Sequence, residues 1–142
     1  MISAVLDTNV VVQSVIGSPR SASNRVVRAY DAGRFRLVCS PATIDELVGV
    51  LMVPRIRARH GWSEDQILNF TMSLFFRADV FYGRQSVSVP IPRDVTDTKF
   101  LALVEDSRAD YLVTNDRRHL LPLKRHFRAR IVTPNGFLKV LS

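Results

Sequence analysis

Short apolar runs alternate with amphipathic stretches along this chain. The runs are rich in β-branched residues and are bounded by polar or turn-forming residues, which is typical of buried strands. Five runs predict strands, over residues 2–6, 35–39, 78–82, 111–114 and 130–133. Between them, apolar residues spaced three and four apart predict helices. These cover residues 21–32, 97–107 and 134–141, and three more begin near Val10, at Ser40 and at Ser63.

Local capping signals set the ends of two of these helices. Ser40 followed by Pro41 places a capping serine and a first-turn proline at one start, and Pro54 ends that helix. Ser63 with Gln66 three residues later makes a capping-box pattern at the next start. A short basic segment is expected between the two helices.

Strands that alternate with helices predict an α/β fold, with a mostly parallel five-stranded sheet covered on both faces. The chain has 142 residues, the size of one ordinary domain, so residues 1–142 are expected to form a single domain. In such sheets, ligands bind beyond the carboxyl ends of the strands, near the point where the strand order reverses. Functional residues are therefore expected directly after strands.

Two acidic residues occupy such positions. Asp7 follows the first predicted strand and Asp116 follows the fourth. If those strands are neighbours, the two carboxylates approach each other, and one must take a proton or recruit a cation. Carboxylate oxygens suit Mg²⁺ or Mn²⁺ and do not suit zinc. Such an ion can activate water and neutralise charge on a phosphodiester.

Asp97 is a third candidate for this acidic group. It begins a predicted helix in phase with the apolar residues Phe100, Leu101 and Val104, so its carboxylate is expected to face the edge of the sheet. The alternative is a capping role, in which Asp94 is the N-cap and Asp97 serves the helix dipole.

Glu46 is supported less directly by its pattern. On a helical wheel it lies opposite Ile44, Leu47 and Leu51, which favours a solvated acid in the first turns of the helix. That helix follows a strand, however, so its N-terminus lies at the same edge as Asp7. Asp45 is the competing acid in the same turn.

Four polar residues flank the acids that follow strands. Their side chains can orient carboxylates or water by hydrogen bonds, or they can simply form the turn after a strand. They are Thr8, Asn9, Thr114 and Asn115.

Four segments resemble, in order, the motifs of the PIN-domain nucleases. The similar segments are VLDTNV at residues 5–10, IDEL at 44–47, DVTDTKFL at 94–101 and DYLVTND at 110–116. The resemblance implies a three-layer α/β/α sandwich and hydrolysis of RNA that leaves a phosphate on the 5′ side of the cut. It places the family's catalytic and Mg²⁺- or Mn²⁺-binding acids at Asp7, Glu46, Asp97 and Asp116.

Supporting polar positions of the family fall on Asn9 and Thr114, with Asp94 as a further supporting acid. Close relatives often carry aspartates where this chain has Thr96 and Thr98. The short members that this chain most resembles are VapC-type bacterial toxins, each inhibited by a small antitoxin protein. The resemblance thus implies an RNA substrate and a small cognate antitoxin as partners.

The charge of the chain agrees with a polyanionic partner. Its net charge is +7, and 17 of its 20 basic residues are arginines, whose planar guanidinium suits phosphate. Arg55, Arg57, Arg117 and Arg118 are the expected RNA contacts. The alternative for each is an ordinary solvated surface residue.

The lengths of the apolar runs predict a cytoplasmic protein. No apolar run reaches the roughly 20 residues needed to span a bilayer, and Asp7 interrupts the first one. The lone Cys39 lies in an apolar run and is expected in the core. We therefore expect a cytoplasmic protein with no membrane association.

Aromatic side chains and histidines have two candidate roles each. Trp62 is expected to pack at the start of a helix, with base stacking as the alternative. The three histidines show no metal-ligand spacing, so we expect them to contact solvent or phosphate. Other aromatic residues are expected in the core or in the surface of a homodimer; they are Phe75, Phe76, Phe81 and Tyr82.

Three functions are compatible with this sequence. The first is a Mg²⁺- or Mn²⁺-dependent endoribonuclease, the toxin of a toxin–antitoxin pair. The second, which Thr96 and Thr98 suggest, is a PIN fold without a working metal site that binds RNA or a partner protein. The third is a phospho-receiver domain. It is disfavoured because that class needs an acidic pair after the first strand and a lysine after the last, where this chain has Asp7 alone and Thr133-Pro134.

Overall fold

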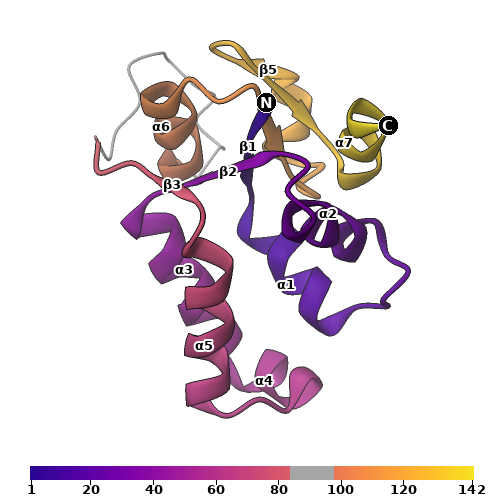
Figure 1. The fold of residues 1–142 in the computed structure, drawn as a ribbon, viewed down its shortest axis with the longest axis vertical. Coiled ribbons are helices and arrows are strands. Elements are labelled where there is room, and N and C mark those ends of the chain that lie inside the picture. Colours follow the sequence, from indigo (N-terminus) through magenta and orange to yellow (C-terminus); the bar gives the residue numbers. More distant parts are fainter. Residues whose placement is uncertain (84–97) are drawn as a thin grey trace.

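A mostly parallel sheet with helices on both faces forms the centre of the protein (Figure 1). The computed structural model describes residues 1–83 and 98–142. Within these residues the sheet has six strands in the order β3-β2-β1-β4-β6-β5. The strands are β1 (Ser3–Leu6), β2 (Arg36–Cys39), β3 (Asp79–Val80), β4 (Tyr111–Val113), β5 (Arg125–His126) and β6 (Ala129–Val132).

The strand order reverses at β1. From β1 the chain builds outward through β2 to β3, and it then returns to the other side of β1 to form β4. Both neighbours of β1 are parallel to it, and Leu6 of β1 pairs with Val113 of β4. The residues that follow these two strands therefore emerge side by side at the carboxyl edge of the sheet, the position where such folds bind ligands.

The predicted α/β/α sandwich is confirmed, with one strand more than expected. The five predicted strands correspond to β1, β2, β3, β4 and β6. The missed strand, β5, has two residues and runs antiparallel to β6 at the edge of the sheet. It is too short and too polar to produce an apolar run, so no periodicity in the sequence could reveal it.

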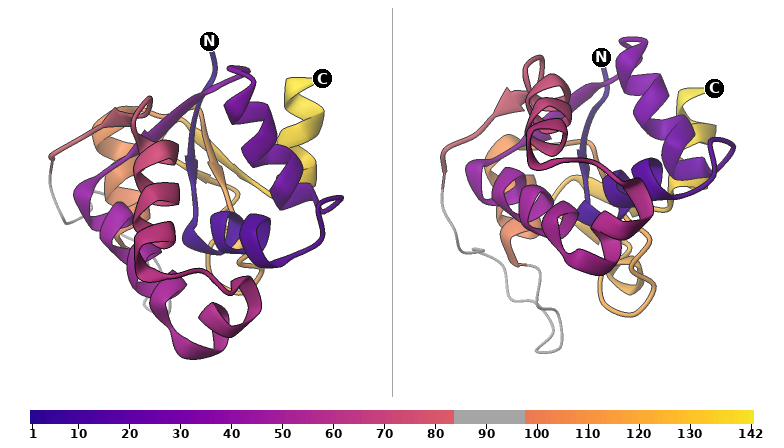
Figure 2. Two further views of the ribbon diagram at one scale, coloured as in Figure 1. Left: turned by 60° about the horizontal axis from the view of Figure 1, so that its bottom comes forward. Right: turned by 90° about the horizontal axis from the view of Figure 1, so that it is seen from below.

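Helices cover the two faces of the sheet (Figure 2). The helices are α1 (Thr8–Ile16), α2 (Ala22–Asp31), α3 (Pro41–Met52), α4 (Pro54–His60), α5 (Glu64–Phe75), α6 (Thr98–Ser107) and α7 (Pro134–Leu141), and η1 (Leu121–Leu123) is a short 3-10 helix. Successive residues of a strand point to opposite faces. Accordingly Ala4 and Leu6 belong to the core that packs against α1, α2 and α7, whereas Val5 belongs to the core under α6.

Capping residues begin the helices where the sequence predicts them. Ser63 accepts a hydrogen bond from the Gln66 amide at 3.1 Å, and the Gln66 side chain accepts one from the Ser63 amide at 2.8 Å. Ser40 and Thr43 make the same reciprocal arrangement at the start of α3. The basic segment after Pro54 is itself helical and forms α4.

The predicted positions of the cysteine and the aromatic residues are confirmed in part. Cys39 is buried as expected, and burial raises the pKa of its thiol to about 12. Trp62 packs against Phe70, which supports the packing interpretation. A core position is wrong for Phe76 and Tyr82, which are 88% and 82% exposed. No helix in the described ranges is long and apolar enough to span a membrane.

The expectation that the histidines contact solvent or phosphate is wrong for His126. Its side chain is 5% exposed, and its Nε2 lies 2.7 Å from Oε2 of Glu105, whose side chain is fully buried. This pair ties β5 to α6 beneath the sheet. The His126–Glu105 pair could not be predicted from the sequence, because a two-residue strand is too short to show which of its side chains points inward.

We predict that breaking this pair destabilises the protein strongly. Glu105→Ala leaves His126 buried without its carboxylate, so the free energy of unfolding should fall by about 3 kcal/mol. Glu64→Ala, at an exposed position in α5, is the matched control and should cost less than about 1 kcal/mol. Urea denaturation measures both. Equal small losses for the two variants would show that the pair does not hold β5 in place.

Candidate functional site

Asp7 occupies the junction between β1 and α1. It is the N-cap residue of α1, but its side chain makes no capping hydrogen bond. Instead, the buried carboxylate, 3% exposed, accepts a hydrogen bond at 2.6 Å from the hydroxyl of Thr114. The Asp7 carboxylate is therefore oriented towards the end of β4 and not towards its own helix.

Thr114 connects the ends of the two central strands. Its hydroxyl donates to Asp7 and accepts a hydrogen bond from the backbone N–H of Asp116 at 2.9 Å. The side chain is fully buried. One hydroxyl thus fixes the Asp7 carboxylate and the turn that carries Asp116. This is the arrangement expected of an orienting residue.

Asp116 lies at the same edge, in the turn after β4. Its Oδ1 accepts hydrogen bonds from the backbone N–H groups of Arg118 and His119, at 3.1 and 2.9 Å. These bonds hold the turn and keep the half-buried carboxylate at the rim. Asn9 is close by, because its side-chain oxygen accepts a hydrogen bond from the Asn115 amide at 3.3 Å.

Glu46 is not the solvated acid that its place on the helical wheel favours. Its side chain is 24% exposed and accepts hydrogen bonds from the hydroxyl of Thr8 and from Nζ of Lys99, the latter at 2.6 Å. Asp45, the competing acid, is exposed. The contact of Lys99 with Glu46 was not predicted, although Lys99 stands within the third motif, two residues after Asp97.

A hollow of about 350 Å³ brings Asp7 and Glu46 together. It lies between α1, α3 and α4. The residues that line it are Asp7, Thr8, Asn9, Val12, Gln13, Glu46, Val50 and Ile56. Asp116 joins this site through Thr114, whereas Asp94 and Asp97 lie outside the described residues.

A family model described as the PIN domain matches residues 3–118, a span that contains all four predicted acids. The chain belongs to the PIN-domain family. PIN domains are generally nucleases and commonly use divalent metals such as Mg²⁺, so the family supports a metal-dependent nuclease fold and a hydrolase that acts on nucleic acids. The comparison with curated proteins gives no match.

The chemistry of the acidic residues in this PIN fold suits a hard divalent cation. The ligand atoms on offer are carboxylate oxygens, which Mg²⁺ and Mn²⁺ prefer, and the buried Asp7 is already oriented by Thr114. Across residues 1–83 and 98–142, no three His, Cys, Asp or Glu side chains are grouped closely enough to hold a metal ion. The roles of Asp7, Glu46 and Asp116 as metal ligands therefore stay predictions.

The basic residues expected to contact RNA stand on two sides of this site. Arg117 and Arg118 are exposed in the turn directly after Asp116. Arg55 and Arg57 are exposed on α4, whose Ile56 lines the hollow. Arg57 also donates a hydrogen bond to the Trp62 carbonyl at 3.2 Å, which ties it to the end of α4. Their contact with RNA stays a prediction.

We predict that the Thr114 hydroxyl and the Asp7 carboxylate are energetically coupled. Thr114→Val removes the hydroxyl but keeps the shape, and should lower the free energy of unfolding by about 1–3 kcal/mol because the buried Asp7 carboxylate and the half-buried Asp116 amide each lose a partner. Thr114→Ser should recover most of the loss. A double-mutant cycle with Asp7→Asn, followed by urea denaturation, measures the coupling. Strict additivity of the two substitutions would contradict the orienting role of Thr114.

Proposed function

We propose that this PIN-family protein is an endoribonuclease that hydrolyses phosphodiester bonds of RNA with Mg²⁺ or Mn²⁺. Its metal-binding acids would be Asp7, Glu46, Asp97 and Asp116. The observation that carries the proposal is the buried Asp7 carboxylate at the strand-order reversal, fixed by Thr114 and facing the same hollow as Glu46. Burying a carboxylate costs free energy. His126 offsets that cost for Glu105 within the core, whereas Asp7 lines an open hollow.

Each residue of the site has a defined task in this proposal. The divalent ion would supply charge to polarise a phosphate and to lower the pKa of a water molecule. Thr114 keeps the Asp7 carboxylate turned towards the site, and the turn after β4 holds the Asp116 carboxylate at the rim. Arg117 and Arg118, exposed beside Asp116, would bind phosphates that flank the scissile bond.

The resemblance to VapC-type proteins suggests a cellular role. We propose that the protein acts in the cytoplasm as the toxin of a toxin–antitoxin pair, is inhibited by a small cognate antitoxin, and forms a homodimer. The exposed aromatic residues Phe76 and Tyr82 are consistent with a surface that another protein chain covers.

A second candidate function has an observation in its favour. Both oxygens of Glu46 are engaged, one by Thr8 and the other by the Lys99 ammonium group. A lysine that neutralises this acid reduces the need for a metal ion. We therefore retain the alternative that the protein is a catalytically inactive PIN fold that binds RNA or a partner protein.

RNA cleavage tests the first proposal. We predict that the wild type cuts RNA in Mg²⁺, and that EDTA or Asp7→Asn lowers the rate by at least about 100-fold, since a catalytic metal contributes several kcal/mol. Asp45→Asn, which removes an exposed neighbouring acid, is the matched control and should keep the wild-type rate. Full activity with both EDTA and Asp7→Asn would exclude the mechanism. RNA binding without cleavage would favour the inactive alternative.

A further inference from the structure

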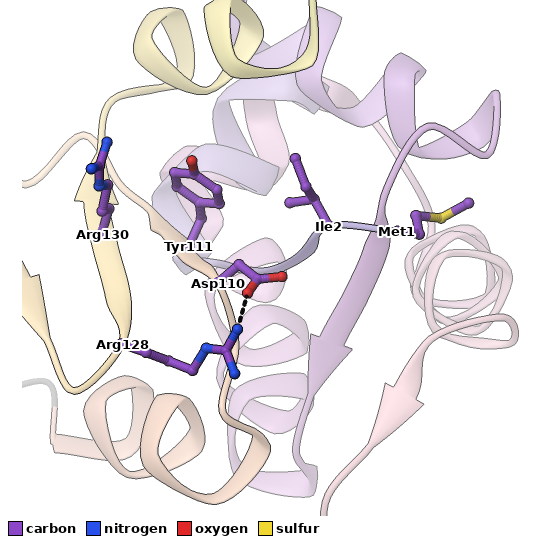
Figure 3. Close-up of a pocket in the computed structure, with 6 residues that line it drawn as sticks. All are labelled: Met1, Ile2, Asp110, Tyr111, Arg128 and Arg130. Carbon is purple, nitrogen blue, oxygen red and sulfur yellow. Dashed lines mark hydrogen bonds and ion pairs between the residues drawn. The ribbon is translucent and has the colours of Figure 1, made fainter.

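A second hollow, of about 770 Å³, lies at the opposite end of the sheet from the acidic site (Figure 3). Its lining comes from the segments at the amino ends of β1, β4 and β6. The lining residues are Met1, Ile2, Asp110, Tyr111, Arg128 and Arg130. Asp110 and Thr114 stand at the two ends of β4, so the hollow is about 13 Å from the acidic site at roughly 3.3 Å per strand residue.

Asp110, the acidic residue of this hollow, accepts hydrogen bonds from groups of the protein itself. The Asp110 carboxylate accepts hydrogen bonds from the backbone amide and the hydroxyl of Ser3, at 3.0 and 3.2 Å, and from Arg128 at 3.0 Å. The bond from the Ser3 amide is the main cause that lowers the pKa of Asp110. Asp110 therefore stays ionised and compensates Arg128, its one arginine partner among the described residues.

Among the described residues, no carboxylate compensates Arg130 and Arg125 in this way. They are directly paired residues of the antiparallel β5–β6 ladder, so their side chains leave the sheet on the same face, a placement in which like charges repel. Both are exposed, and neither takes part in an ion pair with another described residue. An anion that bridged the two guanidinium groups would remove this repulsion.

The residues around the pair favour a nucleic acid. Tyr111 is the neighbour of Arg130 in register on β4, and Figure 3 shows the Tyr111 hydroxyl and the Arg130 guanidinium pointing to the same side. Phe127, in the turn between β5 and β6, is 45% exposed, but its ring stacks on His126, which points to the α6 face of the sheet, opposite to Arg125 and Arg130. The Tyr111 ring is half-buried and packs on Phe137, so it offers its polar edge beside Arg130. Arginines that contact phosphates next to a partly exposed aromatic side chain suit a single strand.

A series of basic residues also extends from the acidic site to the β5–β6 hairpin. The chain passes from Arg117 and Arg118, beside Asp116, through η1 to Lys124 and Arg125. Because β5 is antiparallel to β6, this segment runs from the carboxyl end of the sheet towards the amino end. An RNA strand bound at the acidic site can therefore follow basic side chains along one edge of the molecule.

We propose that the β5–β6 hairpin is a second RNA-binding site, at which Arg125 and Arg130 bind backbone phosphates of a single strand several nucleotides from the scissile bond. This inference rests on the proposed ribonuclease function. Arg130 is in register with Tyr111, three residues before Thr114, so the two sites are at least about 10 Å apart at roughly 3.3 Å per strand residue. At about 3.4 Å per stacked nucleotide, this corresponds to roughly three nucleotides. An acidic protein segment is the competing occupant of this surface.

Binding of a 20-nucleotide oligouridine in EDTA tests the inference without relying on cleavage. Fluorescence anisotropy over a range of salt concentrations gives the affinity and its salt dependence. We expect Arg125→Ala/Arg130→Ala to weaken binding by about 20-fold at 0.1 M salt, and to reduce the slope of log K against log salt by about 1.4, or about 0.7 for each phosphate contact. Arg125→Lys/Arg130→Lys keeps both charges and should keep the slope.

Arg20→Ala/Arg25→Ala is the matched control, since it removes two exposed charges before and within α2 and should leave the slope unchanged. A wild-type slope in the Arg125/Arg130 variant would overturn the inference. So would an equal reduction in the control, or a loss of poly-glutamate binding with RNA binding unchanged, which would indicate an acidic protein partner.

Cleavage of the same oligonucleotide in Mg²⁺ separates the two proposals. If both are correct, Arg125→Ala/Arg130→Ala raises KM and leaves kcat unchanged, because these residues are remote from the acidic site. Failure of the ribonuclease proposal would leave every variant inactive while the difference in RNA binding persists. Failure of the present inference would leave wild-type binding and KM in the double variant.

Discussion

The parallel pairing of β1 with β4 is the constraint on which the candidate site depends. It places Leu6 beside Val113, so that Asp7 and Thr114 emerge next to each other from strands more than 100 residues apart in sequence. The Asp7 amide donates to the Val113 carbonyl at 2.9 Å, and the Thr114 hydroxyl donates to the Asp7 carboxylate. Burying a carboxylate costs free energy, and this hydrogen bond offsets part of that cost while it fixes the orientation of the carboxylate.

Charge is arranged along the strand direction in this protein. Asp7 and Asp116 follow the carboxyl ends of β1 and β4. Towards the amino edge, Arg125 and Arg130 stand on the β5–β6 hairpin without an ion pair to any other described residue. Two further carboxylates are paired locally, Glu105 with His126 and Asp110 with Arg128. In the proposed function this arrangement would attract a polyanion along one edge of the molecule and a small cation at one end of the sheet.

Much of this fold follows from short-range patterns in the sequence. Apolar runs predicted five strands, and Ser40 and Ser63 predicted two helix starts, because the residues that decide these elements are neighbours in the chain. Asp7 and Asp116 were predictable at one edge because parallel strands share their carboxyl ends. Lys99 on Glu46, His126 on Glu105 and the pairing of Arg125 with Arg130 were not predictable. Each depends on contacts between distant segments or on the register of a two-residue strand.

Calorimetric titration with Mn²⁺ tests directly whether carboxylates that follow separate strands bind one shared cation. We expect the wild type to bind Mn²⁺ in one saturable event. Asp7→Asn and Asp116→Asn should each weaken that same event by at least about 10-fold, since each removes an oxygen ligand, whereas Asp45→Asn should leave it unchanged. Wild-type Mn²⁺ affinity in both Asp7→Asn and Asp116→Asn, or no binding by the wild type, would contradict the account.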